Sequence, residues 1–236
     1  MTRIQSVPWL RIGAESVAIV GSILLAFAID AAWDSRVERA QEQAYLAALQ
    51  VQFQQSLDQL QGHILSLENA REATKQILSI DQADLQAIEW EDFAKLLRQS
   101  ISLGRINLPS GALEALVSSG ELRILADREL AARLANWSSL IAEGYENATL
   151  LLENRENHLH PLLAEHRINA LQFAPQLSDF PPSHFEPSLE TLYADPRFDT
   201  ILAVRAAQIG GSLDRHRTLA SEAVAILDLI QKNIDN

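Results

Sequence analysis

The hydrophobic pattern at the start of the chain differs from that of the rest. From Ile12 to Ile29 every residue except Glu15 is Ala, Val, Ile, Leu, Phe, Gly or Ser. At about 1.5 Å rise per residue, this run spans roughly 27 Å as a helix, close to the thickness of a hydrocarbon core. Trp9 and Trp33 flank the run, as interfacial aromatic residues do. The pattern predicts a transmembrane helix over residues 12–33.

Small residues recur at every fourth position of this segment and would share one helix face. They are Ala14, Ala18, Ser22 and Ala26. Such faces let transmembrane helices approach closely, so a homodimer through this helix is a hypothesis. Glu15 and Asp30 lie about one turn inside the two ends, where we expect them to reach the headgroup region; buried functional charges are the alternative.

Cleavage and orientation of this segment are two further questions. The triplet Ala26-Phe27-Ala28 resembles a signal-peptide cleavage site, so removal of the segment is an alternative. The apolar run continues past this site, which favours an uncleaved anchor. Basic residues almost balance across the segment: Arg3 and Arg11 precede it, and Arg36 and Arg39 follow it. We expect residues 1–11 to face the cytoplasm and the bulk of the chain to lie in the periplasm, on the inner membrane.

Apolar residues beyond the anchor step by three or four positions, the period of an amphipathic helix. The first row comprises Leu46, Leu49, Phe53, Leu57, Leu60, Ile64, Leu67, Ala70, Thr74 and Ile77. This row predicts a long helix from residue 34 to about 80, with the near-heptad spacing of a coiled coil. Neither Pro nor a turn cluster separates it from the anchor, so we expect one continuous helix.

Shorter periodic segments follow a break at residues 81–91. They predict helices over residues 91–102 and 110–119, and a longer helix from 127 to about 170. Gly120 is the natural C-cap residue of the second, because Gly adopts the left-handed conformation readily. Asp127 is the expected N-cap of the third, and Pro161 should kink or end it.

The last part of the chain contains a Pro-rich connection and a final long helix. Residues 173–197 contain five Pro and four aromatic residues, and we expect these aromatics to cover the core; a functional loop is the alternative. Asp195-Pro196 is a strong helix start. The final row comprises Phe198, Leu202, Ile209, Leu213, Ala220, Leu227, Ile230 and Ile234, and Gly210-Gly211 would bend this helix or admit a close neighbour.

No segment shows a convincing strand pattern. The sequence therefore predicts an all-α protein, in which an N-terminal transmembrane helix is followed by an elongated antiparallel helical bundle over residues 34–236. One short motif adds to this. Leu116-Val-Ser-Ser-Gly-Glu-Leu122 and the pair Asp30 and Trp33 at the end of the anchor resemble those of a widespread group of uncharacterised bacterial single-pass membrane proteins, defined by a domain of unknown function. The resemblance implies a membrane-anchored helical protein and supplies no catalytic residue.

Composition narrows the possible functions. The net charge of −12 argues against nucleic-acid binding, since phosphate contacts need a cationic surface. It also argues against a bundle that lies on anionic lipid. The absence of Cys excludes disulfides, thiol catalysis and thiolate metal sites.

Histidines are the best candidates for chemistry. His158, His160 and His166 cluster in sequence around Pro161, with Glu156 and Glu165 nearby. No HExxH spacing exists, so solvated histidines are favoured over a zinc or pH-sensing site. His63 and His216 lie near the two long rows, and we expect them to meet across the bundle as polar residues that set the register.

No residue is therefore assigned as catalytic, cofactor-binding or metal-binding. The leading hypothesis is a non-enzymatic scaffold or interaction protein of the cell envelope, in contact with the lipid bilayer and with a protein partner of unknown identity. An extracytoplasmic ligand-sensing bundle is the first alternative. An envelope enzyme that uses a metal site in the His/Glu cluster is the second.

Overall fold

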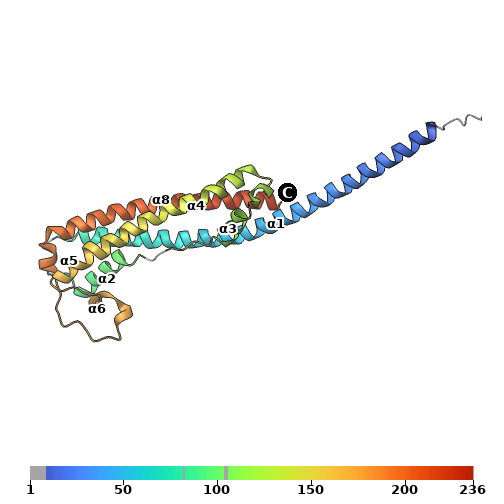
Figure 1. Ribbon diagram of the computed structural model, residues 1–236. Coiled ribbons are helices and arrows are strands. Elements are labelled where there is room, and N and C mark those ends of the chain that lie inside the picture. Colours follow the sequence, from blue (N-terminus) through green and yellow to red (C-terminus); the bar gives the residue numbers. More distant parts are fainter. Residues whose placement is uncertain (1–8, 82, 104–105, 236) are drawn as a thin grey trace, which may run out of the picture.

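The protein is an elongated bundle from which one helix extends (Figure 1). The computed structural model describes residues 9–81, 83–103 and 106–235, without the side chains of residues 9–14, 16–18, 146 and 147. The α-helices are α1 (Trp9–Leu78), α2 (Trp90–Ile101), α3 (Gly111–Ser118), α4 (Arg128–Asn154), α5 (His160–Glu165), α6 (Ala170–Phe173), α7 (Leu189–Tyr193) and α8 (Pro196–Ile234). Short turns of 3-10 helix (Glu121–Ile124, Pro175–Leu177) and π-helix (Arg155–Leu159) lie between them. No strand occurs in the described ranges, and the prediction of an all-helical bundle is confirmed.

The chain passes along the bundle four times, in alternating directions. α1 leads away from the extended end, α2 and α3 return along it, α4 leads away again, and α8 returns (Figure 1). The hydrogen bonds fix this order, because Thr74 near the end of α1 meets Ser100 on α2, and Gln52 meets Ala112 at the start of α3. The second passage is thus two short helices joined by an extended segment instead of one long helix.

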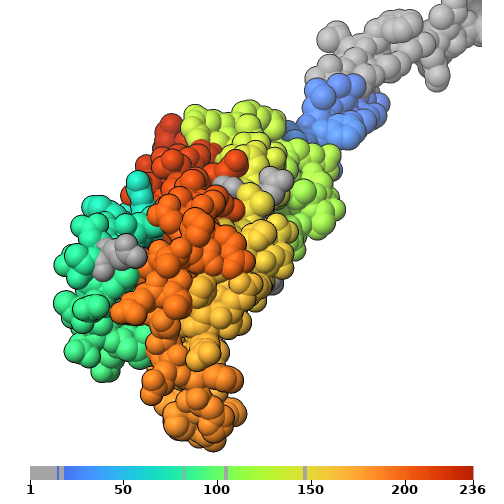
Figure 2. Space-filling model, turned by 90° about the vertical axis from the view of Figure 1, so that its left-hand side faces the viewer, coloured from blue at the N-terminus to red at the C-terminus, as the bar shows by residue number. Residues whose placement is uncertain are grey.

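The N-terminal part of α1 leaves the bundle and has no helix beside it (Figures 1 and 2). Its large apolar side chains are exposed, among them Leu24 at 63% and Phe27 at 66%. Ser22 and Ala26 of the predicted packing face are also exposed, while the side chains of Ala14 and Ala18 lie outside the described residues. Within the residues that the structure describes, no helix is both long and apolar enough to cross a membrane.

Strict alternation of three and four residues places the core positions of both long helices. In α1 the inward residues are Leu46, Leu49, Phe53, Ser56, Leu60, His63, Leu67, Ala70, Thr74 and Ile77. In α8 they are Phe198, Leu202, Arg205, Ile209, Ser212, His216, Leu219, Ala223, Ile226 and Ile230. The sequence prediction was wrong where it chose an apolar neighbour of a polar core residue, such as Leu57 for Ser56. In the last helix it took Leu213 without Ser212, so the row continued one position late, at Ala220 instead of Leu219.

The corner between α3 and α4 is held to α1 by side chains. Gly120 has φ 72°, the left-handed conformation that ends α3, and Asp127 accepts hydrogen bonds from the backbone N–H groups at the start of α4. Glu121 accepts hydrogen bonds from Tyr45 and from Gln41, the latter at 3.0 Å. The motif of Leu116 to Leu122 therefore has a structural explanation in this fold.

Gln52 caps α3 from a neighbouring helix. Its Oε1 accepts hydrogen bonds from the backbone N–H of Ala112 at 2.7 Å and of Leu113 at 3.2 Å, while the local N-cap residue, Ser110, makes no side-chain cap. Gln52→Leu leaves these donors unpaired near the core, so we expect a loss of about 1–2 kcal/mol in unfolding free energy. Urea denaturation measures it. Gln55→Leu, an exposed position on the same helix, is the control, and an equal loss in both variants would contradict the cap.

The helix that begins at Arg128 ends earlier than predicted. It passes through the π-helical turn into α5 and stops at Glu165, not near residue 170. The wider π turn accommodates Pro161, whose ring would clash with the carbonyl four residues earlier in a regular α-helix. Arg167, at φ 64°, takes the left-handed position that usually holds Gly, and Ile168 N–H then bonds back to Leu163 O at 2.8 Å.

The Pro-rich connection is only partly packed on the core. Phe173 is buried and Tyr193 donates its hydroxyl hydrogen to Ile77 O at 2.9 Å, but Phe180 and Phe185 are 60% and 59% exposed. The expectation that all its aromatics cover the core was therefore wrong for these two.

Close approach of helices occurs at Gly144 and not at Gly210-Gly211. A Cβ added to Gly144 would lie 3.1 Å from Leu219 Cδ1, whereas nothing lies within 4 Å of such an atom at Gly210 or Gly211. α8 continues through the Gly pair as one helix.

Candidate functional site

Polar side chains occupy three of four successive core positions in the middle of α8. Arg205, Ser212 and His216 are each 1% exposed, and Ile209 is the only core residue of the row between the first two. Apolar clusters lie toward both ends of the bundle. We call these three residues, with His63 opposite them on α1, the central polar core.

Arg205 is a buried cation without a carboxylate partner among the described residues. Its Nε donates to Ser100 O at 2.9 Å and its Nη1 donates to Leu151 O at 3.2 Å. None of the ion pairs of the described side chains includes it. Burial, helped by the nearby Arg155, lowers the pKa of Arg205 to about 10, so its guanidinium is still charged at neutral pH.

His63 and His216 meet across α1 and α8, as the sequence predicted. Their ring centroids lie 4.6 Å apart and their planes are inclined by 48°. The Nδ1 of His216 lies 2.7 Å from Ser212 O and donates to it. Burial, and then the charge of His216, lowers the pKa of His63 to about 4, and burial also lowers the pKa of His216. Both rings are therefore neutral at pH 7.

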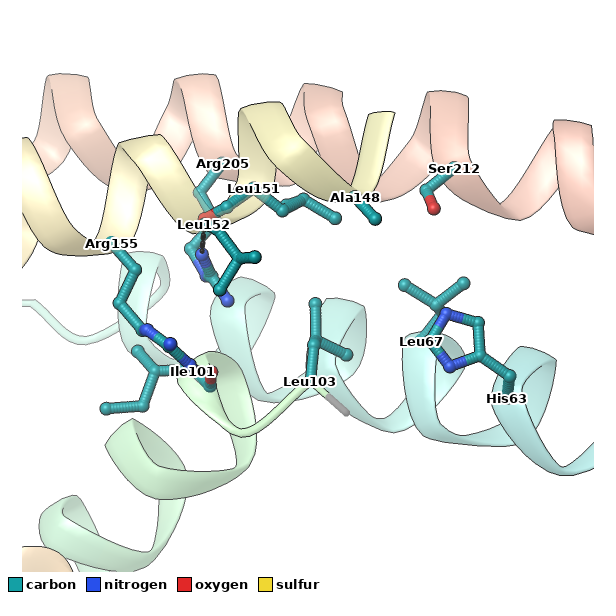
Figure 3. Close-up of a pocket in the computed structure, with 10 residues that line it drawn as sticks. All are labelled: His63, Leu67, Ile101, Leu103, Ala148, Leu151, Leu152, Arg155, Arg205 and Ser212. Carbon is teal, nitrogen blue, oxygen red and sulfur yellow. Dashed lines mark hydrogen bonds between the residues drawn. The ribbon is translucent and has the colours of Figure 1, made fainter. Parts of the chain in front are cut away.

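A cavity of about 20 Å³ adjoins this core, and Figure 3 shows its lining. Arg205 and Arg155 lie toward one end in that view and His63 toward the other, with Leu103 between them. Ser212 also lines it. A volume of this size holds one water molecule or one monatomic ion. The remaining lining residues are apolar: Leu67, Ile101, Leu103, Ala148, Leu151 and Leu152.

The histidines around Pro161 do not form one site. His158 is exposed and His160 pairs with Glu156, with Nδ1 3.2 Å from a carboxylate oxygen. His166 instead faces α8, where its Nε2 lies 3.2 Å from Asp195. Within the described residues, no group of three or more His, Cys, Asp or Glu side chains is placed to hold a metal ion.

The contacts of His166 join the helices at the far end of the bundle. Its Nδ1 lies 3.1 Å from the Thr191 hydroxyl, which itself donates to Ser188 O in the first turn of α7. The hydrogen bonds of Arg197 lower the pKa of Asp195, the N-cap residue of α8. Every group of this cluster thus has a role in joining or capping α5, α7 and α8.

Sequence reasoning missed Arg205, and one available signal would have found it. Counting alternately four and three residues from Phe198 leads to Arg205, Ser212 and His216 in turn. Selecting only apolar residues leaves Arg205 and Ser212 out of the row, although the positions on either side of Arg205, Leu202 and Ile209, were correctly chosen. When a polar residue lies at a position of an otherwise regular heptad row, the spacing therefore predicts that it is in the core.

Comparison with protein-family models, with curated proteins and with solved structures finds no match to this chain. The resemblance of its turn motif and anchor to single-pass membrane proteins therefore stays a prediction.

Proposed function

We propose that this protein is a membrane-anchored helical bundle that acts without catalysis, as a scaffold or interaction protein of the bacterial cell envelope. Residues 12–33 would lie in the inner membrane, as a single span, and the bundle in the periplasm. One observation carries the proposal: the N-terminal part of α1 leaves the bundle with its apolar side chains exposed (Figure 1).

The exposed area argues for burial in lipid. Seven large apolar residues of this segment are 51–66% exposed: Ile19, Val20, Ile23, Leu24, Leu25, Phe27 and Ile29. Burying a side chain of this kind is worth about 1.5–3 kcal/mol, so transfer of all seven from water is favourable by on the order of 10 kcal/mol. No other part of the described chain covers them. A bilayer supplies the missing apolar surroundings.

The dimensions fit a spacer that stands on the membrane. The first contact of α1 with the body of the bundle is made by Gln41, eight residues after Trp33. At about 1.5 Å per residue, the bundle would begin roughly 12 Å from the interface. Residues 41–78 would then place the opposite end a further 55 Å or so away. A homodimer through the face of Ala14, Ala18, Ser22 and Ala26 remains part of this proposal, since small residues permit close packing in lipid.

Alkaline extraction of bacterial membranes tests the anchor. We expect the full-length protein to stay in the pellet, and we expect Leu24→Arg with Leu25→Arg to move it to the supernatant, since Arg at the centre of a span is strongly unfavourable. The matched control is Val51→Arg with Leu65→Arg on the same helix, because both side chains are 59% exposed within the bundle.

Two results would contradict the anchor. One is extraction of the unaltered protein by alkali. The other is a mature chain that begins at Ile29, which would identify a cleaved signal peptide. Digestion of the bundle by protease added to spheroplasts tests its periplasmic location, and complete protection would reverse the topology. Crosslinking in mild detergent tests the interaction role, and recovery of the protein alone would argue against a different protein as partner.

A ligand-sensing bundle is the second candidate. The cavity beside Arg205 favours it, since ligand sites of helical bundles lie between the helices and combine an apolar lining with a few polar groups.

A further inference from the structure

We propose that the cavity beside Arg205 binds a small inorganic anion of halide size. Two guanidinium groups, those of Arg205 and Arg155, line it together with His63 and the Ser212 hydroxyl (Figure 3). None of the described Asp or Glu side chains lines it. This inference does not depend on the membrane anchor.

The charges around the cavity do not balance. Arg155 pairs with Glu156 at 2.8 Å, but the carboxylate side chain is 53% exposed and its field is screened by water. Among the residues that the structure describes, the partners of Arg205 are backbone carbonyls alone. Ser100 O and Ile101 O, which accept from the two Arg side chains, belong to the last turn of α2 and carry at most about half a negative charge. A net positive charge therefore stays buried.

An anion offsets this charge better than water does. Arg205 is still protonated at neutral pH, and an uncompensated buried charge is strongly destabilising. A water molecule would satisfy N–H donors but would leave the net charge unchanged. The guanidinium groups of Arg205 and Arg155 supply N–H donors for an anion without any need for a metal.

The size and lining of the cavity limit the class of anion. About 20 Å³ accommodates one monatomic ion and excludes a nucleotide, a lipid headgroup or a sugar. The Leu side chains of the lining favour a weakly hydrated ion, because such an ion loses little on leaving water. Chloride and bromide fit both requirements.

Halide dependence of thermal stability tests the site. Full-length protein in detergent is heated in sodium chloride, sodium bromide or sodium gluconate at equal ionic strength. At a tenfold excess over Kd we expect the Tm to lie about 3 °C higher in chloride or bromide than in gluconate, and to rise further with the logarithm of halide concentration. Gluconate is too large for the cavity and should give no such halide-specific rise.

Variants test whether the rise in Tm arises from binding in the cavity. Arg205→Met should abolish this halide-specific rise in Tm, and Arg155→Gln, which keeps Arg205 in place, should raise the halide Kd at least fivefold. Arg217→Met is the matched control, because Arg217 lies on α8 but is exposed and pairs with Glu68 at 2.7 Å. Should Arg205→Met fail to fold, the Arg155→Gln comparison and the bromide measurement below still decide the question.

Bromide also allows the bound anion to be located directly. A crystal soaked in bromide should show one anomalous peak between Arg205 and Arg155, and chlorine-35 NMR should show line broadening that bromide competes away. Absence of a halide-specific rise in Tm in the unaltered protein, or its retention in Arg205→Met, would overturn the proposal. A water molecule in the cavity with no anomalous peak would overturn it as well.

Discussion

Replacing Trp137 by Ala should lower the free energy of unfolding by about 3–5 kcal/mol, the usual range for a large aromatic residue lost from a core. Trp137 is 1% exposed on α4, and its ring centroid lies 5.0 Å from that of Phe53 on α1. The two rings join the first and third passages of the bundle. The cavity left by Trp137→Ala cannot collapse easily, because long helices on both sides hold their spacing.

Denaturant unfolding followed by far-UV circular dichroism measures this loss without depending on Trp fluorescence. Leu150→Ala is the control, since Leu150 lies on the same helix and is 44% exposed; we expect a change within about 0.5 kcal/mol. A loss below about 1 kcal/mol for Trp137→Ala would mean that the ring is not packed as described.

Acidification from pH 6.5 to about 4 should lower the unfolding free energy by about 3 kcal/mol through His63, because its pKa falls from 6.5 in the unfolded chain to about 4 in the fold. The unfolded chain binds protons in this window and the folded protein does not. Stability is therefore full above pH 6.5 and falls as the pH decreases toward 4. His216 adds to the loss, since burial lowers its pKa too.

The positive charges of two neighbouring Arg side chains disfavour protonation of His63, as burial does. Arg205 and Arg155 line the cavity that His63 also lines, so a protonated ring would add a third positive charge.

Two carboxyl groups, those of Asp127 and Asp195, have pKa values that are lowered by hydrogen bonds. They lose their stabilising effect at more acidic pH, as the pH falls through and below about 4. The two contributions thus fall in different parts of the profile.

A double variant isolates the histidine contribution. His63→Leu with His216→Leu should flatten the profile of unfolding free energy between pH 6.5 and 4, while the decline below pH 4 remains. His158→Gln is the control, because this side chain is exposed and lies outside the pair. A profile of the double variant that still falls by about 3 kcal/mol in this window would show that other groups are responsible.

Local sequence determined the helices and most of their ends. Heptad spacing over residues 46–77 and 198–230 dictates two long amphipathic helices, because only the helical period brings these apolar residues to one face. Asp127 and Asp195 start helices through bonds to backbone N–H groups two or three residues away, so the signal is entirely local. The meeting of His63 and His216 followed from their places beside these rows.

Tertiary structure decided the points at which a distant residue competes with the local pattern. The cap of α3 comes from Gln52, sixty residues earlier in the chain, and the left-handed residue that ends α5 is Arg167 because Ile168 is drawn into the core beside Leu163. Arg205 is buried because the heptad register fixes its position and because carbonyl groups of α2 and α4 accept hydrogen bonds from its guanidinium. A sequence shows the spacing of such a residue but not the acceptors that make its burial possible, since these belong to segments far apart along the chain.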